Sequence, residues 1–395
     1  MVDLSGARDA VPVPDGSEVL DATGQTIIPG LVDLHGHYGG SIEAAEQALR
    51  HQLYYGVTTT RSIGSDPPDK VALMLEAHAG RPDLPRAFTA GLGFSYPGGF
   101  NSSFPNLPTT EEEAREMVRE QAALDVHFTK MWVNEVAEPD LKIPPEIRAA
   151  IVDESIQNGL VPVAHIDEES DAIQLLEAGL NEFLHSTVLT FGPGSGAPVD
   201  EPAPGQTFID LCLERDCAFT PTLSIIQNNW HFAEHPELLE DAELQRVMNP
   251  GALERFSDPD TRAGITEADN FADRQAAFRQ VQDFVKAIHD AGINVALGTD
   301  SGTANVPMGW GTHHELKLYV EAGLTPMETL VAATATGASR MPPVGEADFG
   351  TLTAGMSADL VLLDADPLED IANTLAIDRV MLRGEWVDRA SLLAP

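Results

Sequence analysis

The sequence has little cysteine and no long run of apolar residues. Its 395 residues include two cysteines, Cys212 and Cys217, whose spacing matches neither a redox motif nor a zinc knuckle. No stretch of eighteen apolar residues occurs, and the first residues lack the basic and apolar regions of a signal peptide. We therefore expect two buried thiols, no membrane association and a cytoplasmic protein.

Positive charge is also scarce, and lysine is scarcer than arginine. Lysine and arginine together number 23 against 62 aspartates and glutamates, which gives a formal net charge of −39. Such a charge repels nucleic acid and anionic lipid. An acidic composition with little lysine resembles that of proteins from salt-accumulating halophiles, in which molar salt screens the self-repulsion. The lysines are Lys70, Lys130, Lys142, Lys286 and Lys317.

The sequence does contain a regular alternation of strand-like and helix-like segments. Two helix starts have a threonine three residues before a glutamate, Thr110 with Glu113 and Thr325 with Glu328, which is the pattern of a capping box. Alternating strands and helices predict a parallel sheet, and eight such strands close a barrel. We therefore predict an α/β fold, a TIM (β/α)8 barrel over residues 29–344. The candidate strands are residues 31–37, 57–64, 86–94, 127–133, 161–167, 182–188, 218–224 and 294–302.

Both ends of the chain have a different pattern, with short alternating strands, turn glycines and no long helix. Because the ends share this pattern, we expect residues 1–28 and 345–395 to pair into a small accessory β-sandwich beside the barrel. Two insertions, residues 189–208 and about 225–272, follow predicted strands. Loops at the carboxyl ends of barrel strands build substrate pockets, so we expect these insertions near the active site.

Two histidines stand at the end of the first predicted strand, in the stretch VDLHGHYGG. Side chains two residues apart in a strand point to the same side, so His35 and His37 present both imidazoles to one face. His165, His185 and Asp300 each follow apolar residues at the end of another predicted strand. The carboxyl ends of barrel strands meet at one face, so all five side chains are expected to converge. Imidazole and carboxylate suit a divalent ion, zinc foremost, with one position open to water.

Lys130 lies among apolar residues in the predicted strand HFTKMWV. Burying an ammonium group is costly, so the position requires an explanation. Two interpretations remain open. The lysine either extends toward solvent or pairs with Glu135, or its amine is carbamylated by CO2 and bridges two metal ions as a carboxylate.

These residues lie in stretches that resemble the amidohydrolase superfamily, in its branch of imidazolonepropionase-like and prolidase-like metal-dependent hydrolases. The resemblance runs in the family's order from about residue 20 to residue 390. The family usually opens with a further strand and turn, and this sequence starts inside that region, so a less complete accessory domain is expected. The matching stretches are DATGQTIIPGLVDLHGH, YYGVTTTRSIG, FTKMWVNE, VPVAH, NEFLHST, GTDSGT, HHELKLYVEAGLTPMETLVAATATGASRM and GTLTAGMSADLVLLDADP.

The resemblance implies a binuclear centre of two divalent ions, with zinc the expected metal and an N6-carboxylysine at Lys130. Members of the family without this lysine hold one ion, so Lys130 decides between the two forms. Asp300 corresponds to the aspartate of the last strand and would take the proton of the attacking water as a general base. The implied ligands are His35 and His37 of the first strand, the bridging Lys130, His165 and His185 for the second ion, and Asp300.

The leading function hypothesis is hydrolysis of a C–N amide bond in an N-acyl amino acid or a Xaa-Pro-like dipeptide, by a hydroxide held between the ions. A second hypothesis is hydrolysis of a cyclic amide, a lactone or a phosphotriester. A third, from another class, is a metal-binding scaffold without catalysis. We expect a small-molecule substrate, no nucleic-acid or membrane partner, and a homo-oligomer. Candidate substrate contacts are Tyr38, Tyr96, His313 and His314.

Overall fold

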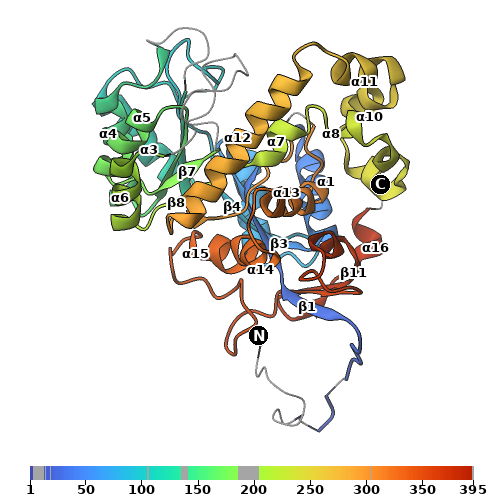
Figure 1. The fold of residues 1–395 in the computed structure, drawn as a ribbon. Helices are drawn as coiled ribbons and strands as arrows, with labels where there is room; N and C mark the ends of the chain where they lie inside the picture. Colours follow the sequence, from blue (N-terminus) through green and yellow to red (C-terminus); the bar gives the residue numbers. More distant parts are fainter. Residues whose placement is uncertain are drawn as a thin grey trace.

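The computed structural model has parallel strands at its centre, helices around them and a small antiparallel sheet at one end, where β1 and β11 are labelled in Figure 1. The helices α3 to α6 lie together on one side of the strands, next to β7 and β8 (Figure 1). The described residues are 1–2, 13, 15–17, 19–104, 106–134, 141–185, 204–303 and 305–393.

Eight parallel strands form two sheets, and each of the eight predicted ranges contains one of them. The sheets follow the order of the chain, and every neighbouring pair within them is parallel. The first sheet contains β2 (Leu31–Gly36), β3 (Val57–Ser62) and β4 (Arg86–Thr89). The second contains β5 (Phe128–Val133), β6 (Val161–Ile166), β7 (Glu182–Leu184), β8 (Ala218–Thr220) and β9 (Asn294–Val295).

Backbone contacts link the two parallel sheets at both edges. At one edge, Gly36 of β2 forms a parallel bridge with Ser301, which follows β9. At the other, Phe94, which follows β4, forms a parallel bridge with Met131 of β5. The first and last parallel segments are therefore backbone neighbours, as are the third and fourth.

Helices follow most of the parallel strands, and capping residues fix several of their starts. At α1 (Ile42–Tyr54), Ser41 Oγ accepts a hydrogen bond from Ala44 N–H. At α14 (Pro326–Val331) the predicted capping box is complete, because Thr325 and Glu328 each accept from the backbone N–H of the other. The remaining helices of this set are α2 (Pro68–Ala79), α3 (Glu111–Ala122), α4 (Pro145–Gln157), α5 (Glu169–Ala178), α6 (Gln206–Glu214), α12 (Phe271–Asp290), α13 (Trp310–Glu321), the π-helix η4 (Ala332–Thr336) and α15 (Gly337–Ser339).

The predicted capping box at α3 is only half formed. Thr110 accepts from Glu113 N–H as predicted. The Glu113 carboxylate instead accepts from Thr109 N–H at 2.8 Å and from Thr109 Oγ1 at 2.7 Å. A neighbouring threonine hydroxyl thus competes for the carboxylate.

Short helices occupy the insertion predicted at about residues 225–272. Figure 1 shows α8, α10 and α11 grouped at one corner of the molecule, away from α3 to α6. The other predicted insertion, residues 189–208, lies outside the described residues as far as residue 203. The short helices are α7 (Leu223–Gln227), α8 (His231–Glu234), η3 (Pro236–Glu240), α9 (Ala242–Val247), α10 (Pro250–Ser257) and α11 (Pro259–Thr266).

The two ends of the chain pair into one antiparallel sheet. Its four strands have the order β1-β10-β11-β12, so the first strand of the chain joins three of the last. They are β1 (Thr26–Pro29), β10 (Leu360–Leu363), β11 (Ile377–Leu382) and β12 (Glu385–Trp386), accompanied by η5 (Ile371–Leu375) and α16 (Arg389–Leu392).

The described residues at the chain ends form this single sheet, and the second layer of the predicted β-sandwich stays a prediction. Val361 and Leu363 of β10 are buried in the same core cluster as Val57 of β3. The face of β10 that carries these two side chains is therefore covered by the parallel strands.

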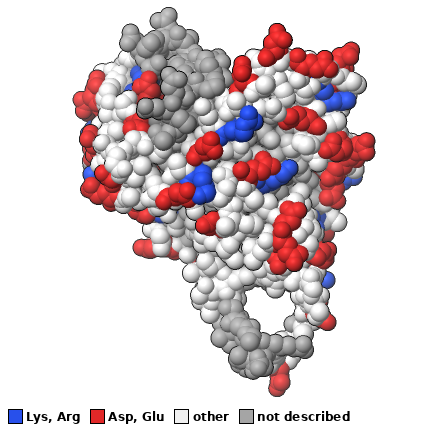
Figure 2. Space-filling view, viewed as in Figure 1, with Lys and Arg blue, Asp and Glu red and all other residues white. Residues whose placement is uncertain are grey.

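The surface and interior agree with the composition. Figure 2 shows acidic side chains spread over much of the visible face, with fewer basic ones among them. Cys212 and Cys217 are both buried and unpaired, as expected. Within the described part of the chain, no helix has both the length and the apolar character needed to cross a membrane.

Candidate metal centre

The six residues predicted as ligands come from five parallel strands or from the residues directly after them. The structure brings all six to one cavity of about 470 Å³. They are His35 of β2, His37 just after it, Lys130 of β5, His165 of β6, His185 directly after β7, and Asp300 in the segment after β9.

His35, His37 and Asp300 form the closest group of donor atoms. His35 Nε2 lies 3.3 Å from His37 Nε2. Asp300 Oδ1 lies 3.5 Å from the first nitrogen and 3.1 Å from the second. Two nitrogens each about 2.1 Å from one tetrahedral ion would lie roughly 3.4 Å apart. The spacing of the three atoms therefore fits three ligands of a single ion.

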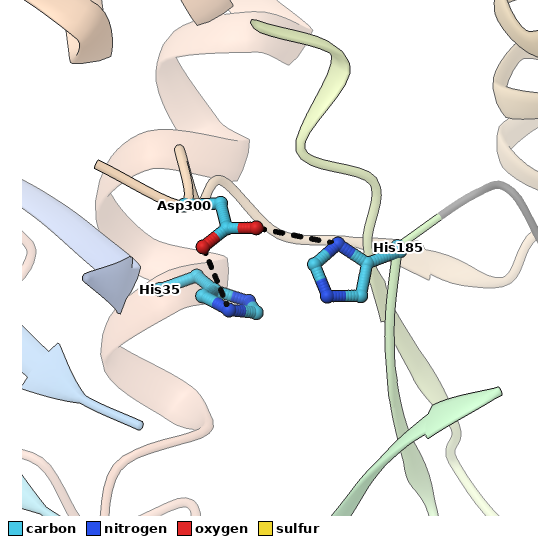
Figure 3. Close-up of side chains that lie close together, drawn as sticks. All are labelled: His35, His185 and Asp300. Carbon is cyan, nitrogen blue, oxygen red and sulfur yellow. Dashed lines mark ion pairs between the residues drawn. The ribbon is translucent and has the colours of Figure 1, made fainter. Parts of the chain in front are cut away.

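Asp300 also faces a second pair of imidazoles. Its Oδ2 lies 4.0 Å from His185 Nδ1, so the carboxylate stands between His35 and His185 (Figure 3). The ring centroids of His165 and His185 are 4.3 Å apart. One carboxylate thus lies between the pair His35 and His37 and the pair His165 and His185.

A hydroxyl group close to Nδ1 orients two of the rings. Thr222 Oγ1 donates to Pro221 O at 2.8 Å, so it accepts from His185 Nδ1–H at 2.7 Å. His37 Nδ1 lies 3.1 Å from Ser65 Oγ. A proton on Nδ1 leaves the lone pair of Nε2 free, which is the form of histidine that binds a metal ion.

The surroundings keep three of these imidazoles neutral. Burial lowers the pKa of His35 well below its ordinary value, and the charges of His185 and Lys130 lower it further. Burial also lowers the pKa of His185 and that of His165. Neutral rings keep the lone pair that a metal ligand requires.

Lys130 is fully buried, so the interpretation in which it extends to solvent is wrong. Its Nζ has no hydrogen-bond partner among the described residues, and Glu135, the predicted alternative partner, lies outside them. Gly64 makes room for the side chain, because a Cβ there would lie 2.8 Å from Lys130 Cγ. Burial lowers the pKa of Lys130 to about 7, although the charge of Asp300 opposes the shift. Near neutral pH a large share of these amines is therefore uncharged.

Backbone strain is concentrated at this site. His185, Thr222 and Asp300 have φ angles of 71°, 52° and 57°, in the left-handed region that residues other than glycine rarely adopt. Each such residue costs on the order of 1 kcal/mol or more, and strain of this kind gathers at functional sites. The turns that aim His185 and Asp300 into the cavity are thus held by the surrounding structure.

Asp33 is a fully buried residue of β2, and its carboxylate supports the site. Its carboxylate accepts from His35 N–H and Thr299 N–H, both at 3.1 Å, and from Thr299 Oγ1 at 2.7 Å. These bonds tie β2 to the segment that carries Asp300. The sequence reasoning missed Asp33, although the alternation along VDLHGH places it on the same side of the strand as His35.

The two tyrosines predicted as substrate contacts do not line the cavity in the described structure. Tyr38 is fully buried, and its hydroxyl lies 2.6 Å from Thr60 Oγ1 and accepts from Gln52 Nε2 at 3.3 Å. Tyr96 is half-buried against the main core cluster. The Tyr38 hydroxyl is engaged by the Thr60 and Gln52 side chains, and contact of either tyrosine with a substrate stays a prediction.

The two histidines predicted as substrate contacts are also outside the described cavity lining. Both ring nitrogens of His313 are engaged, Nδ1 2.9 Å from Thr374 Oγ1 and Nε2 2.9 Å from Tyr55 O. His314 Nε2 lies 2.6 Å from Gln227 Oε1. Both histidines are buried on α13 and join this helix to neighbouring segments, and their contact with a substrate stays a prediction.

The sequence reasoning missed the apolar wall of the cavity. Trp132 could have been predicted, because it lies two residues after Lys130 on one strand and so faces the same side. Phe100 and Phe104 lie in the glycine- and serine-rich stretch GGFNSSF, which has no strand or helix periodicity. The apolar wall residues are Phe100, Phe104, Trp132 and Ile225.

The donor set fits a divalent ion of the zinc type. His35, His185 and Asp300 each offer a ligand atom within 4.8 Å of the others. Asp300 Oδ1 and Lys130 Nζ are buried without a hydrogen bond in the described part of the chain, which is rare for polar atoms in native proteins. Imidazole nitrogen and carboxylate oxygen are ligands that zinc prefers, and a cation between them would neutralise the buried carboxylate.

Comparisons with known proteins identify the family of this chain. An imidazolonepropionase from Streptomyces griseus subsp. griseus is 27% identical over 386 residues, covering 91% of this chain and 83% of that protein. The structure of a putative prolidase from Bifidobacterium longum has a TM-score of 0.72 and 26% identity, covering 99% of this chain and 90% of that one. The structure of molinate hydrolase is similar in fold, with a TM-score of 0.70 and 22% identity over 100% of this chain and 90% of that one. The sequence profile described as "Amidohydrolase family" matches residues 26–387, so the chain belongs to the amidohydrolase family.

Proposed function

We propose that this protein is a metal-dependent hydrolase that cleaves a C–N amide bond in a small molecule. The observation that carries the proposal is the group of His35, His37 and Asp300 donor atoms, 3.1–3.5 Å apart within a cavity of about 470 Å³. Membership of the amidohydrolase family supports it, as does the likeness to an imidazolonepropionase and to a putative prolidase.

The proposed centre holds two divalent ions, with zinc the expected metal. When bound, such ions polarise a carbonyl oxygen and lower the pKa of an attacking water. Asp300 is the shared residue, because its two oxygens face different pairs of imidazoles. The proposed ligands are His35, His37, Lys130, His165, His185 and Asp300.

Lys130 is proposed to carry a carboxylate. Its neutral amine would form an N–C bond with CO2 and release one proton, so that an anion replaces a buried cation. Full burial, an Nζ without a hydrogen-bond partner among the described residues, and a pKa lowered to about 7 support this reaction.

Asp300 is proposed to move the proton during hydrolysis. Its carboxylate would accept a proton from the attacking water and donate it to the leaving nitrogen as the C–N bond breaks, acting first as general base and then as general acid. Asp300 Oδ1 has no hydrogen bond among the described residues, so a lone pair besides the one that would hold an ion could accept the proton.

The proposed scaffold is a TIM (β/α)8 barrel over residues 29–344, with residues 1–28 and 345–395 as an accessory domain. The bridges Gly36 to Ser301 and Phe94 to Met131 support closure, since they join the two parallel sheets at both edges. Carboxyl ends of strands in such a barrel converge on one active site.

The proposal is tested by assaying zinc-loaded protein in high salt against N-acyl amino acids, dipeptides, anilides, cyclic amides, lactones and a phosphotriester. We expect turnover of a C–N substrate that stops when a chelator removes the metal and that falls by about a thousandfold in Asp300→Asn. Hydrolysis that survives both chelation and Asp300→Asn would contradict the proposal, as would turnover of lactones or phosphotriesters alone. Inactivity of the zinc-loaded protein toward the whole panel would favour the metal-binding scaffold.

A further inference from the structure

The cavity has a flat aromatic wall beside the candidate ligands. The rings of Phe104 and Trp132 are stacked, with centroids 5.4 Å apart and an angle of 6° between their planes. The Phe100 ring lies 5.8 Å from the ring of His165. Ile225 adds an aliphatic surface. Ligand pockets of this size bind chiefly through such apolar walls, with a few polar groups fixing orientation.

The backbone around Trp132 is shaped to hold its ring in this position. A Cβ on Gly93 would lie 2.5 Å from Trp132 Cζ3, and one on Gly64 would lie 3.1 Å from Trp132 Cη2. Two glycines therefore allow the indole to lie against the strands, and its side chain is almost fully buried. Lys130 Nζ lies 5.6 Å from the centre of the same ring. The aromatic surface is thus fixed next to the candidate reaction centre.

The same cavity has little positive charge to offer a substrate. Among the described residues that line it, Lys130 is the one lysine or arginine, and the proposed function makes it an anion. The uncharged polar groups are Ser65, Asn101 and Thr303.

We propose, resting on the proposed function, that the substrate is a neutral amide whose aromatic group lies against Trp132 and Phe104 and which carries no carboxylate. An aromatic ring stacks favourably on such a wall. A substrate carboxylate placed away from the metal ions would lose its hydration without finding a cationic partner. The net charge of −39 also disfavours the approach of an anion. The inference departs from the carboxylate-bearing substrates, N-acyl amino acids and dipeptides, that the sequence predicted.

The first test compares three substrates of zinc-loaded protein in high salt. 4-Acetamidobenzamide and 4-acetamidobenzoate have the same ring and the same scissile bond and differ in charge, and N-butylacetamide is neutral but aliphatic. We expect kcat/KM for 4-acetamidobenzamide, followed by release of 4-aminobenzamide, to exceed each of the other two by about tenfold or more. Equal or faster cleavage of 4-acetamidobenzoate would overturn the inference and leave the proposed hydrolase standing.

Two pairs of variants test whether the preference for a neutral aromatic substrate depends on the apolar wall of the cavity. Trp132→Ala should lower the preference for the aromatic over the aliphatic amide by about tenfold, whereas Trp132→Phe should keep most of it. Ile225→Arg should raise kcat/KM for 4-acetamidobenzoate about tenfold above that of Ile225→Gln, because it supplies the missing cation. Unchanged preferences in Trp132→Ala and Ile225→Arg would overturn the inference. Absence of C–N cleavage for every compound would instead contradict the proposed function on which it rests.

Discussion

His185 shows how a single neighbouring hydroxyl determines what a histidine of the site can do. Thr222 Oγ1 donates to Pro221 O and accepts from His185 Nδ1–H, so the tautomer of this ring is set before any ion binds. Partners of this kind are a large part of metal affinity in proteins. Ser65 Oγ lies close to His37 Nδ1 and can orient that ring in the same way.

Replacing Thr222 by Val removes the acceptor at 2.7 Å from His185 Nδ1 and keeps the shape of the side chain. We expect zinc to bind at least about tenfold more weakly, because the ring loses its fixed tautomer and orientation. A competitive titration with a zinc-binding dye measures this. Thr222→Ser, which keeps the hydroxyl, is the matched control. An unchanged zinc affinity in Thr222→Val would show that Thr222 does not orient His185 for metal binding.

Replacing Lys130 by Ala should weaken metal binding and lower the hydrolysis rate by about a hundredfold or more, because the proposed bridging carboxylate is lost. Small carboxylic acids should restore part of both by occupying the vacated space. Labelling with ¹³C-bicarbonate should give a carbamate signal in the ¹³C NMR spectrum of the wild-type protein. Lys286→Ala is the control, since Lys286 is paired with Asp290 at the surface. Full metal content and rate in Lys130→Ala would make the lysine a structural residue.

The sequence predicted that the six candidate ligands converge but did not predict the cavity wall, for a physical reason. His35, Lys130 and His165 sit in apolar strands whose period of two fixes the side to which a residue points. Phe100 and Phe104 follow no such period, so their position depends on contacts that only the folded chain contains. The four candidate substrate contacts lie outside the described cavity lining, because nearness in sequence to a ligand does not place a side chain in the cavity.

Helix α13 is joined to two other segments by a buried histidine. His313 contacts Thr374 of η5 and the Tyr55 carbonyl at the end of α1, so one ring holds three segments together. Burial lowers its pKa to about 4 from the ordinary value near 6.5. The folded protein therefore resists protonation of this ring.

This shift predicts a pH dependence of stability. Between about pH 6.5 and pH 4 the unfolded chain binds a proton at His313 that the folded chain does not bind. The free energy of unfolding should therefore fall as the pH falls through this range, by an amount on the order of 3 kcal/mol for this residue. Denaturant titrations at several pH values should give a shallower dependence for His313→Gln than for the wild type. Parallel dependences in the two proteins would show that His313 does not contribute.

The strands were predicted in number and order, but several of their ends were not. The range 294–302 was predicted as one strand, whereas β9 spans Asn294–Val295 and the backbone is left-handed at Asp300. Apolar runs show that a segment is buried but not where its backbone turns to aim a side chain. The accessory sheet was likewise predicted from alternation alone, which does not reveal that Val361 and Leu363 pack in one core with the parallel strands.

The acidic surface is a property of the whole molecule. A net charge of −39 is spread over the fold, and Figure 2 shows many acidic groups close to one another on one face. Their mutual repulsion destabilises the compact state in dilute buffer. The Debye screening length is about 10 Å at 0.1 M salt and about 3 Å at 1 M. In molar salt each charge therefore interacts only with its nearest neighbours.

Stability should therefore rise with salt. We expect the melting temperature at pH 7 to be higher by about 10 °C or more in 2 M KCl than in 0.1 M KCl, because screening relieves the repulsion. Near the isoelectric point of about 4.4 the net charge is close to zero, so the same change in salt should have a smaller effect. A melting temperature that stays flat or falls with KCl at pH 7 would mean that the acidity does not limit stability.

The central claim is that six side chains form a binuclear metal centre, and metal stoichiometry tests it most directly. The measurement is elemental analysis after dialysis of the metal-free protein against dilute zinc, with circular dichroism to show that each variant is folded. The account predicts about two zinc ions per chain for the wild type and at most about one for the His35→Ala, His37→Ala double variant. A wild-type chain that binds one zinc ion or none, or a folded double variant that binds as much as the wild type, would contradict it.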